Sequence, residues 1–226
     1  MSKITQDSST MTPNPMISGA SIALGAIISI VLMSYHPSIS AGTTSGALEE
    51  LANEAFVSKI VHGGMIAILG VQTFGFAGFS ARLGLYKSLP LAGFVAYVMG
   101  TMAMVGAVIP SGFLFPDLAI GYLDNPIGDL ESLRTAFFMY SSINQTLAQF
   151  GVIASSVAIF FWSLSLLQKS GVTRVIGILG VPVAAAPAIA ILFGFLVLTV
   201  HGMALVVMVQ ASWSVAVGVQ LWRRKI

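Results

Sequence analysis

The chain has 226 residues, of which 56% are hydrophobic and 8% are charged, and its formal net charge is +2 at pH 7. A soluble domain carries roughly 25% charged residues, so this chain has too few charges to cover a surface that faces water. Its scattered positive charges give no sign of nucleic-acid binding. The lack of cysteine excludes disulfides, thiolate metal sites, iron–sulfur clusters and covalently attached c-type haem. The composition therefore predicts that the main partner is the lipid bilayer.

Long apolar segments predict an all-α, polytopic integral membrane protein with six transmembrane helices. A spanning helix needs about 20 apolar residues, and these segments lack the alternating pattern of a membrane β-barrel. The expected spans are residues 16–35, 57–81, 89–109, 143–167, 175–191 and 195–222. Pro182 and Pro187 predict that the fifth helix is bent or interrupted. Gly19 and Ala23, one turn apart, predict close packing of the first helix against another helix.

The remaining segments predict a single domain with one tail and two long outer loops. Residues 1–15 are polar and contain two prolines, which indicates a flexible cytoplasmic tail before a six-helix domain over residues 16–226. The outer loops are expected at about 38–55 and 111–134. Ser45 is the expected N-cap of a short helix in the first loop, which should continue into the second span. Trp162 and Trp222 are expected as interfacial aromatic residues near two helix ends.

Basic residues predict the orientation of the helices. Six-helix topology places on one side Lys3, Arg82, Lys87, Lys169, Arg174, Arg223, Arg224 and Lys225. The opposite side is mostly acidic, and basic residues favour the cytoplasmic side of a membrane. Both termini are therefore expected in the cytoplasm, in a bacterial inner membrane or an equivalent membrane.

The three histidines of the chain are predicted to lie within the outer third of the bundle. His36 is at the outer end of the first span, His62 about one turn into the second, and His201 about two turns into the sixth. Ionisable residues inside a membrane are costly and usually face the protein interior, where they mark functional sites. All three are therefore candidate ligands.

Three interpretations of these histidines stay open. One is a haem b with His62 and His201 as axial ligands, with neighbouring glycines such as Gly63 allowing the porphyrin to approach. Another is a Cu or Zn site that uses His36, His62 and His201, the kind of ligand that divalent metals accept. Methionines at 33, 65 and 203 would suit copper. In the third, no cofactor binds and the histidines only cap helices or hydrogen-bond to neighbours.

Four further polar residues are candidates for supporting such a site. Asn144, Gln145 and Gln149 in the fourth span would act as hydrogen-bond donors to ligand histidines, or would instead bond between helices. Glu54 belongs to a strip of residues spaced by four along one helix face, Glu50, Glu54, Ser58 and His62, which would lead protons or cations from the outer surface down to His62. Alternatively, these carboxylates are simply the solvated end of the helix.

Two helices share a short sequence pattern. Val61-His62-Gly63 is followed by Gln72, and Val200-His201-Gly202 is followed by Gln210. The glutamines lie about three turns deeper than their histidines and are expected to bond between helices.

These features favour a membrane protein with a histidine-lined haem b or metal site near the outer face, for electron transfer or metal handling. The sequence holds no Walker loop, GxSxG motif or paired-carboxylate site, and enzymatic activity stays open. One alternative is a non-catalytic accessory or scaffold subunit of a larger bioenergetic membrane complex. The other is a carrier for a small apolar molecule, for which the two prolines of the fifth span are the hint.

Overall fold

The computed structural model describes residues 13–125 and 130–226, and within these it is all-helical. Eight α-helices and one π-helical turn follow one another in the described chain. They are α1 (Pro15–Ser34), α2 (Thr44–Asn53), α3 (Ala55–Leu83), α4 (Ser88–Ile109), the π-turn Pro110–Leu114, α5 (Phe115–Asp124), α6 (Leu130–Leu167), α7 (Gly171–Leu192) and α8 (Val200–Trp222). The predicted all-α fold is confirmed.

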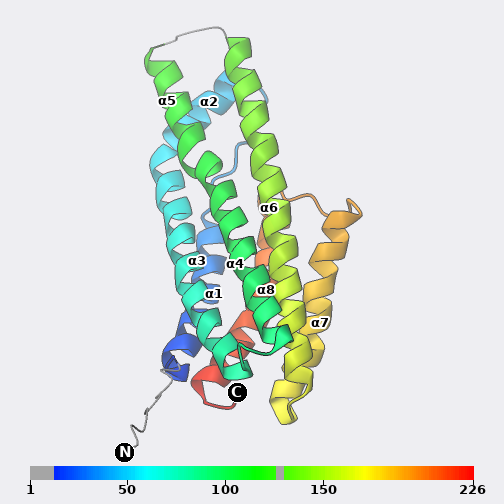
Figure 1. The fold of residues 1–226 in the computed structure, drawn as a ribbon. Helices are drawn as coiled ribbons and strands as arrows, with labels where there is room; N and C mark the ends of the chain where they lie inside the picture. Colours follow the sequence, from blue (N-terminus) through cyan, green and yellow to red (C-terminus); the bar gives the residue numbers. More distant parts are fainter. Residues whose placement is uncertain (1–12, 126–129) are drawn as a thin grey trace, which may run out of the picture.

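Six helical segments of the described chain are long and apolar enough to cross a bilayer, as predicted. They are α1, α3, the continuous run Ser88–Asp124, α6, α7 and α8. Apolar helices of this length satisfy their own backbone hydrogen bonds in lipid, so the chain is a multi-pass membrane protein. Helix α2 is short and lies across the end of the bundle (Figure 1).

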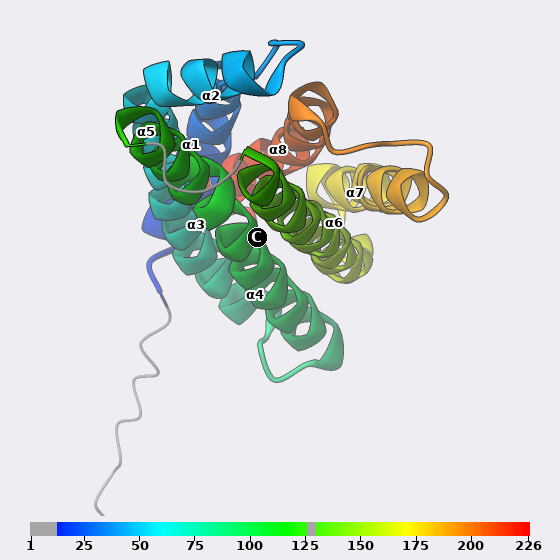
Figure 2. The same ribbon diagram turned by 90° about the horizontal axis from the view of Figure 1, so that it is seen from above.

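The six spanning helices form a closed ring in chain order. Each packs against the next, and α8 returns to pack against α1 (Figure 2). The α1–α8 contact depends on small residues, because a Cβ added at Gly218 would lie 2.7 Å from the carbonyl oxygen of Gly19 and 2.9 Å from Cβ of Ala23. The predicted close packing at Gly19 and Ala23 is confirmed.

An aromatic cluster fills one half of the bundle. It joins α3, α4, α6 and α8, with Phe76 from α3 stacked on Trp162 from α6 at 4.6 Å between ring centroids, and Trp162 nearly parallel to Trp213 from α8 at 6.3 Å. Phe79 and Tyr97 complete the cluster. The prediction that Trp162 is interfacial is wrong, because its side chain is 0% exposed and its indole N–H donates to Ser80 Oγ at 2.9 Å.

The expected outer loop 111–134 is replaced by helix, so this prediction is wrong over its described residues. Pro110 was expected to end the third span, but the chain stays helical there, widens into the π-turn and continues as α5. Helix α6 starts at Leu130 and has 38 residues. At 1.5 Å per residue it is about 57 Å long, well beyond a hydrocarbon core of about 30 Å, so its first turns extend out of the membrane.

The segment 38–55 is also more ordered than a loop. Thr43, and not Ser45, caps α2, with its hydroxyl accepting from the Gly46 N–H at 3.2 Å. Helix α2 ends at Asn53, and Glu54 separates it from α3. The expected continuous helix through Glu54 is therefore not observed.

Helix α7 continues through both of its prolines without interruption, so the expected break is not observed. The helix packs along α6, where a Cβ at Gly177 would lie 2.9 Å from the Ser163 carbonyl oxygen. This close support lets the helix continue despite the donors that Pro182 and Pro187 remove. Helix α8 begins at Val200 rather than at residue 195.

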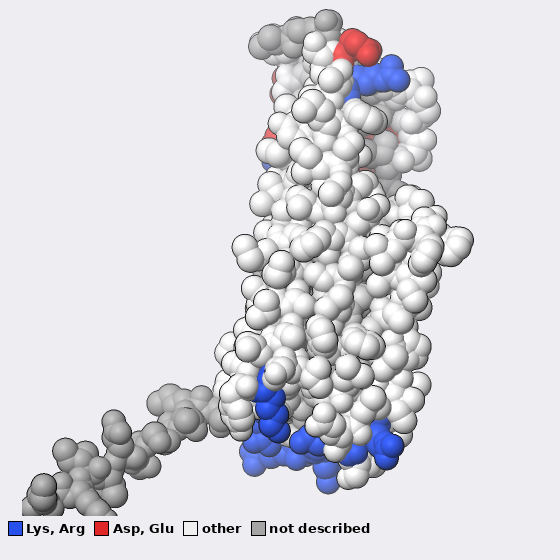
Figure 3. Space-filling model, turned by 45° about the vertical axis from the view of Figure 1, so that its right-hand side comes forward, with Lys and Arg blue, Asp and Glu red and all other residues white. Residues whose placement is uncertain are grey.

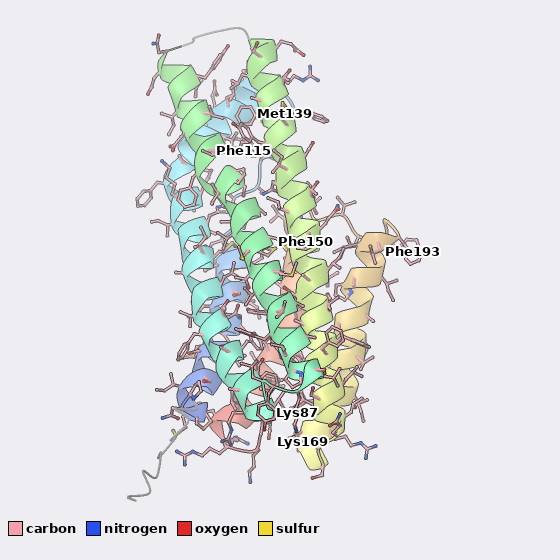
Figure 4. The ribbon with its side chains drawn as sticks, in the orientation of Figure 1. Lys87, Phe115, Met139, Phe150, Lys169 and Phe193 are labelled. Carbon is pink, nitrogen blue, oxygen red and sulfur yellow. The ribbon has the colours of Figure 1, made fainter. Side chains whose placement is uncertain are left out.

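Basic side chains gather at one end of the molecule, here called the basic end (Figure 3). Lys87 and Lys169 lie there, beside the connections from α3 to α4 and from α6 to α7 (Figure 4). The C-terminus and the start of α1 lie at the same end (Figure 1). The predicted tail falls mainly on residues 1–12, which lie outside the described residues.

We predict that the basic end faces the cytoplasm, because basic residues are retained on that side. A reporter that is active only outside the cytoplasm should be silent when fused after Ile226. The same reporter inserted after Gly42, at the far end, should be active, and activity at Ile226 would contradict this orientation.

Candidate functional site

A cavity of about 670 Å³ opens between the helices in the half of the bundle away from the aromatic cluster. We call it the histidine cavity, because all three histidines of the chain line it. Its polar lining includes His36, Ser58, His62, Ser111, Ser141, Asn144, Gln145, Thr199 and His201, and its apolar lining includes Met33, Met65, Met104, Phe115, Leu198 and Met203. The histidines predicted from separate spans thus reach one space.

His62 is the most buried of the three histidines, with 2% of its surface exposed. Its Nδ1 lies 2.8 Å from the carbonyl oxygen of Ser58 and 3.3 Å from that residue's hydroxyl. A carbonyl only accepts, so Nδ1 carries the proton of the neutral ring and donates it to Ser58. Nε2 is then an unprotonated nitrogen, and it is buried without a hydrogen-bond partner in the described chain.

The π-turn fits against His62 because residue 112 is glycine. A Cβ at Gly112 would lie 2.5 Å from His62 Cγ, a distance that only a shift of the helices could relieve. Ser58 Oγ also donates to the Gly112 carbonyl at 3.4 Å. Widened helical turns occur frequently at functional sites, and this one holds α4 directly against the imidazole.

His36 completes a pair with His62. The two rings meet edge to face, with centroids 4.6 Å apart and planes inclined at 66°. His36 Nδ1 lies 2.8 Å from the carbonyl oxygen of Pro37 and so donates to it, as His62 does to Ser58. Burial lowers the pKa of His36, against the opposing effect of this hydrogen bond, so the ring is neutral at pH 7 with Nε2 unprotonated.

His201 lines the same cavity from the first turn of α8, but His201 is exposed whereas His62 is buried. Across residues 13–125 and 130–226, no group of three or more His, Cys, Asp or Glu side chains is placed to hold a metal ion. The structure therefore brings His36 and His62 together as a pair and leaves His201 as a separate wall of the cavity.

Two of the predicted supporting residues hold backbone instead of histidines. Asn144 donates to the Ala107 carbonyl at 2.6 Å and to Ser111 Oγ at 3.3 Å, beside the π-turn. Gln145 donates to the Leu198 carbonyl at 3.1 Å, in the connection that precedes α8. These bonds join α6 to the last turn of α4 and to the connection before α8, and so keep the cavity walls in place.

Gln149 and Glu54 are exposed and do not line the cavity. Glu50, which belongs to the same strip as Glu54, binds backbone groups of the segment before α2. Its carboxylate accepts from the backbone N–H groups of Ser40 and Ala41, at 2.8 and 3.2 Å. These bonds lower the pKa of Glu50, and they tie down the segment that covers the cavity.

Sequence reasoning missed Met104 and Gly112, and it placed Ser58 on one strip with His62 without predicting the hydrogen bond between them. Met104 lines the cavity with Met33, Met65 and Met203. Its position about one helical turn before the polar end of the third span was the signal in the sequence. Gly112 carried no signal, since its role depends on a turn that the proline was expected to prevent.

Comparison of the chain with models of protein families, with curated proteins and with solved structures gave no match.

We predict that Gly112→Ala destabilises the protein, because its methyl group would overlap the His62 ring. Overpacking of this kind typically costs about 1–3 kcal/mol, seen as a lower midpoint of thermal unfolding in detergent. Gly121→Ala is the control, since nothing lies within 4 Å of a Cβ there. Equal midpoints for the two variants would show that α4 does not press on His62.

Proposed function

We propose that the histidine cavity binds a soft transition-metal ion, Cu(I), through His36 and His62, and that the protein handles this metal at the outer face of the membrane. The observation that carries the proposal is the buried, unpartnered Nε2 of His62. A buried nitrogen that makes no hydrogen bond costs free energy unless a ligand uses it.

The hydrogen bonds of both rings support metal ligation. A histidine that binds a metal almost always donates its other ring N–H to a carbonyl, a carboxylate or water, which fixes the tautomer. His36 and His62 each donate Nδ1–H to a backbone carbonyl. Both rings are thereby set to offer Nε2, and their contact brings the two nitrogens into one region of the cavity.

The remaining lining favours a soft ion over a hard one. Thioethers line the cavity at Met33, Met65, Met104 and Met203, and none of the described lining residues is Asp or Glu. Thioether ligands select Cu(I), whereas Mg²⁺ and Ca²⁺ take carboxylate and carbonyl oxygens. Two imidazoles and one or more thioethers are a suitable ligand set for Cu(I).

A metal ion fits this geometry better than haem b. Axial ligation by His62 and His201 requires open space for the porphyrin at His62, and the ring of His36 already lies against it. Metal handling is therefore preferred to haem-based electron transfer.

The volume of the cavity favours a second candidate, a binding protein or carrier for a small apolar molecule. Pockets for organic ligands measure about 300–1,000 Å³ and are mostly apolar, with a few polar groups that orient the ligand. A cavity of about 670 Å³ with histidines on its wall matches that description.

We predict that the full-length protein in detergent binds one Cu(I) per chain, measured by competition with a chromophoric chelator. Loss of an outer-shell partner already weakens metal binding about 10–100-fold, so His62→Ala and His36→Ala should each weaken it by roughly 100-fold or more. His201→Ala is the matched control and should leave the affinity unchanged.

The same variants separate the alternatives. If the wild-type protein shows a Soret band that is lost in His201→Ala and kept in His36→Ala, the cofactor is haem b and not copper. Wild-type protein that binds neither would contradict both cofactor assignments and favour an apolar ligand or an accessory-subunit role.

A further inference from the structure

A second cavity, of about 120 Å³, lies inside the helix ring between the histidine cavity and the aromatic cluster. We call it the glutamine cavity, because Gln72 from α3 and Gln210 from α8 both line it. The other polar lining residues are Ser29, Tyr97, Ser155 and Ser214, and no charged residue of the described chain lines it. The cavity is thus uncharged, with a few polar groups on a mostly apolar wall.

Gln72 faces this space without a protein partner. The residue is 8% exposed, and its side-chain amide makes no hydrogen bond within the described chain, whereas Gln210 donates to Ser156 Oγ at 3.0 Å. The side chain is fitted closely against α1, since a Cβ at Gly25 would lie 2.6 Å from Gln72 Cγ. An amide has two donors and an acceptor to satisfy, so Gln72 requires a partner from inside the cavity.

The glutamine cavity lies near the middle of the membrane. On α3, Gln72 is thirteen residues beyond Lys59 and ten residues before Arg82, which at 1.5 Å per residue is about 20 and 15 Å. No lipid headgroup or bulk water reaches that depth in a core of about 30 Å. The partner of Gln72 must therefore enter through the protein.

The two cavities are adjacent, and two methionines separate them. Met104 and Met203 line both spaces, and methionine is unbranched and flexible enough to move aside. Toward the basic end, Phe76 and Tyr97 line the glutamine cavity and belong to the buried aromatic cluster. The aromatic cluster therefore closes one direction, and the approach from the histidine cavity runs past the two methionines.

We infer that the glutamine cavity is a second binding site, for water or another small uncharged polar molecule that enters from the histidine cavity past Met104 and Met203. Amides and hydroxyls recognise such molecules by hydrogen bonds, and the lack of charge disfavours ions at this depth. The volume corresponds to about four water molecules at about 30 Å³ each. The inference does not depend on the metal proposed for His36 and His62.

The absence of cysteine from the chain allows a direct test by cysteine accessibility. Ser214→Cys places a thiol on the wall of the glutamine cavity, and Ser212→Cys places one two residues away on the same helix, at an exposed position outside the cavity lining. A thiol ionises in water and not in lipid. With methyl methanethiosulfonate, an uncharged reagent, applied to the full chain in liposomes, Ser214→Cys should react at least tenfold faster than Ser212→Cys.

Three further variants complete the test. Met203→Ala added to Ser214→Cys should increase the rate, because it widens the passage, and Ser141→Cys in the histidine cavity shows that reagent reaches the outer space. Ser155→Cys repeats the test if Ser214→Cys does not fold. Lack of reaction at both inner positions while Ser141→Cys reacts would overturn the inference, whatever the protein does with copper.

Discussion

Aromatic packing between α3, α6 and α8 is the constraint on which the rest of the structure depends. Phe76, Trp162 and Trp213 stack in nearly parallel planes and close the ring of helices toward the basic end. Rings in this arrangement contribute about 0.5–1.5 kcal/mol per pair beyond the area that they bury. Because the helices meet closely at these rings, the histidine cavity lies in the other half of the bundle, and the glutamine cavity lies between that cavity and the rings.

The histidine cavity depends on a second, local constraint. Pro110 has no backbone N–H to donate, and the helix widens into a π-turn at this residue. Asn144 donates to the carbonyl of Ala107 beside the turn. The wider turn brings Gly112 against His62. The repeated pattern of α3 and α8 then gains a structural meaning, because its histidines line one cavity and its glutamines line the other.

Hydropathy was sufficient to predict the six spans and the position of the three histidines toward one end of the bundle, since apolar length and span direction determine both. Helix ends were less predictable. Pro110 does not end the helix, because the chain widens into the π-turn there, and Asn144 of α6 donates to the carbonyl of Ala107 in the preceding turn. Trp162 resembled an interfacial residue by its position, but a partner hydroxyl at Ser80 lets it be buried. The His36–His62 pair depends on how the chain leaves α1, which periodicity does not encode.

The central claim is that His36, His62 and a thioether form a Cu(I) site. X-ray absorption at the copper edge tests this claim most directly. The spectrum of the Cu(I)-loaded protein should show two imidazole nitrogens and at least one sulfur in the first shell. His62→Ala should remove the nitrogen contribution of one ring and the ordered site with it. A first shell of oxygen and nitrogen alone, or a spectrum that His62→Ala leaves unchanged, would contradict the account.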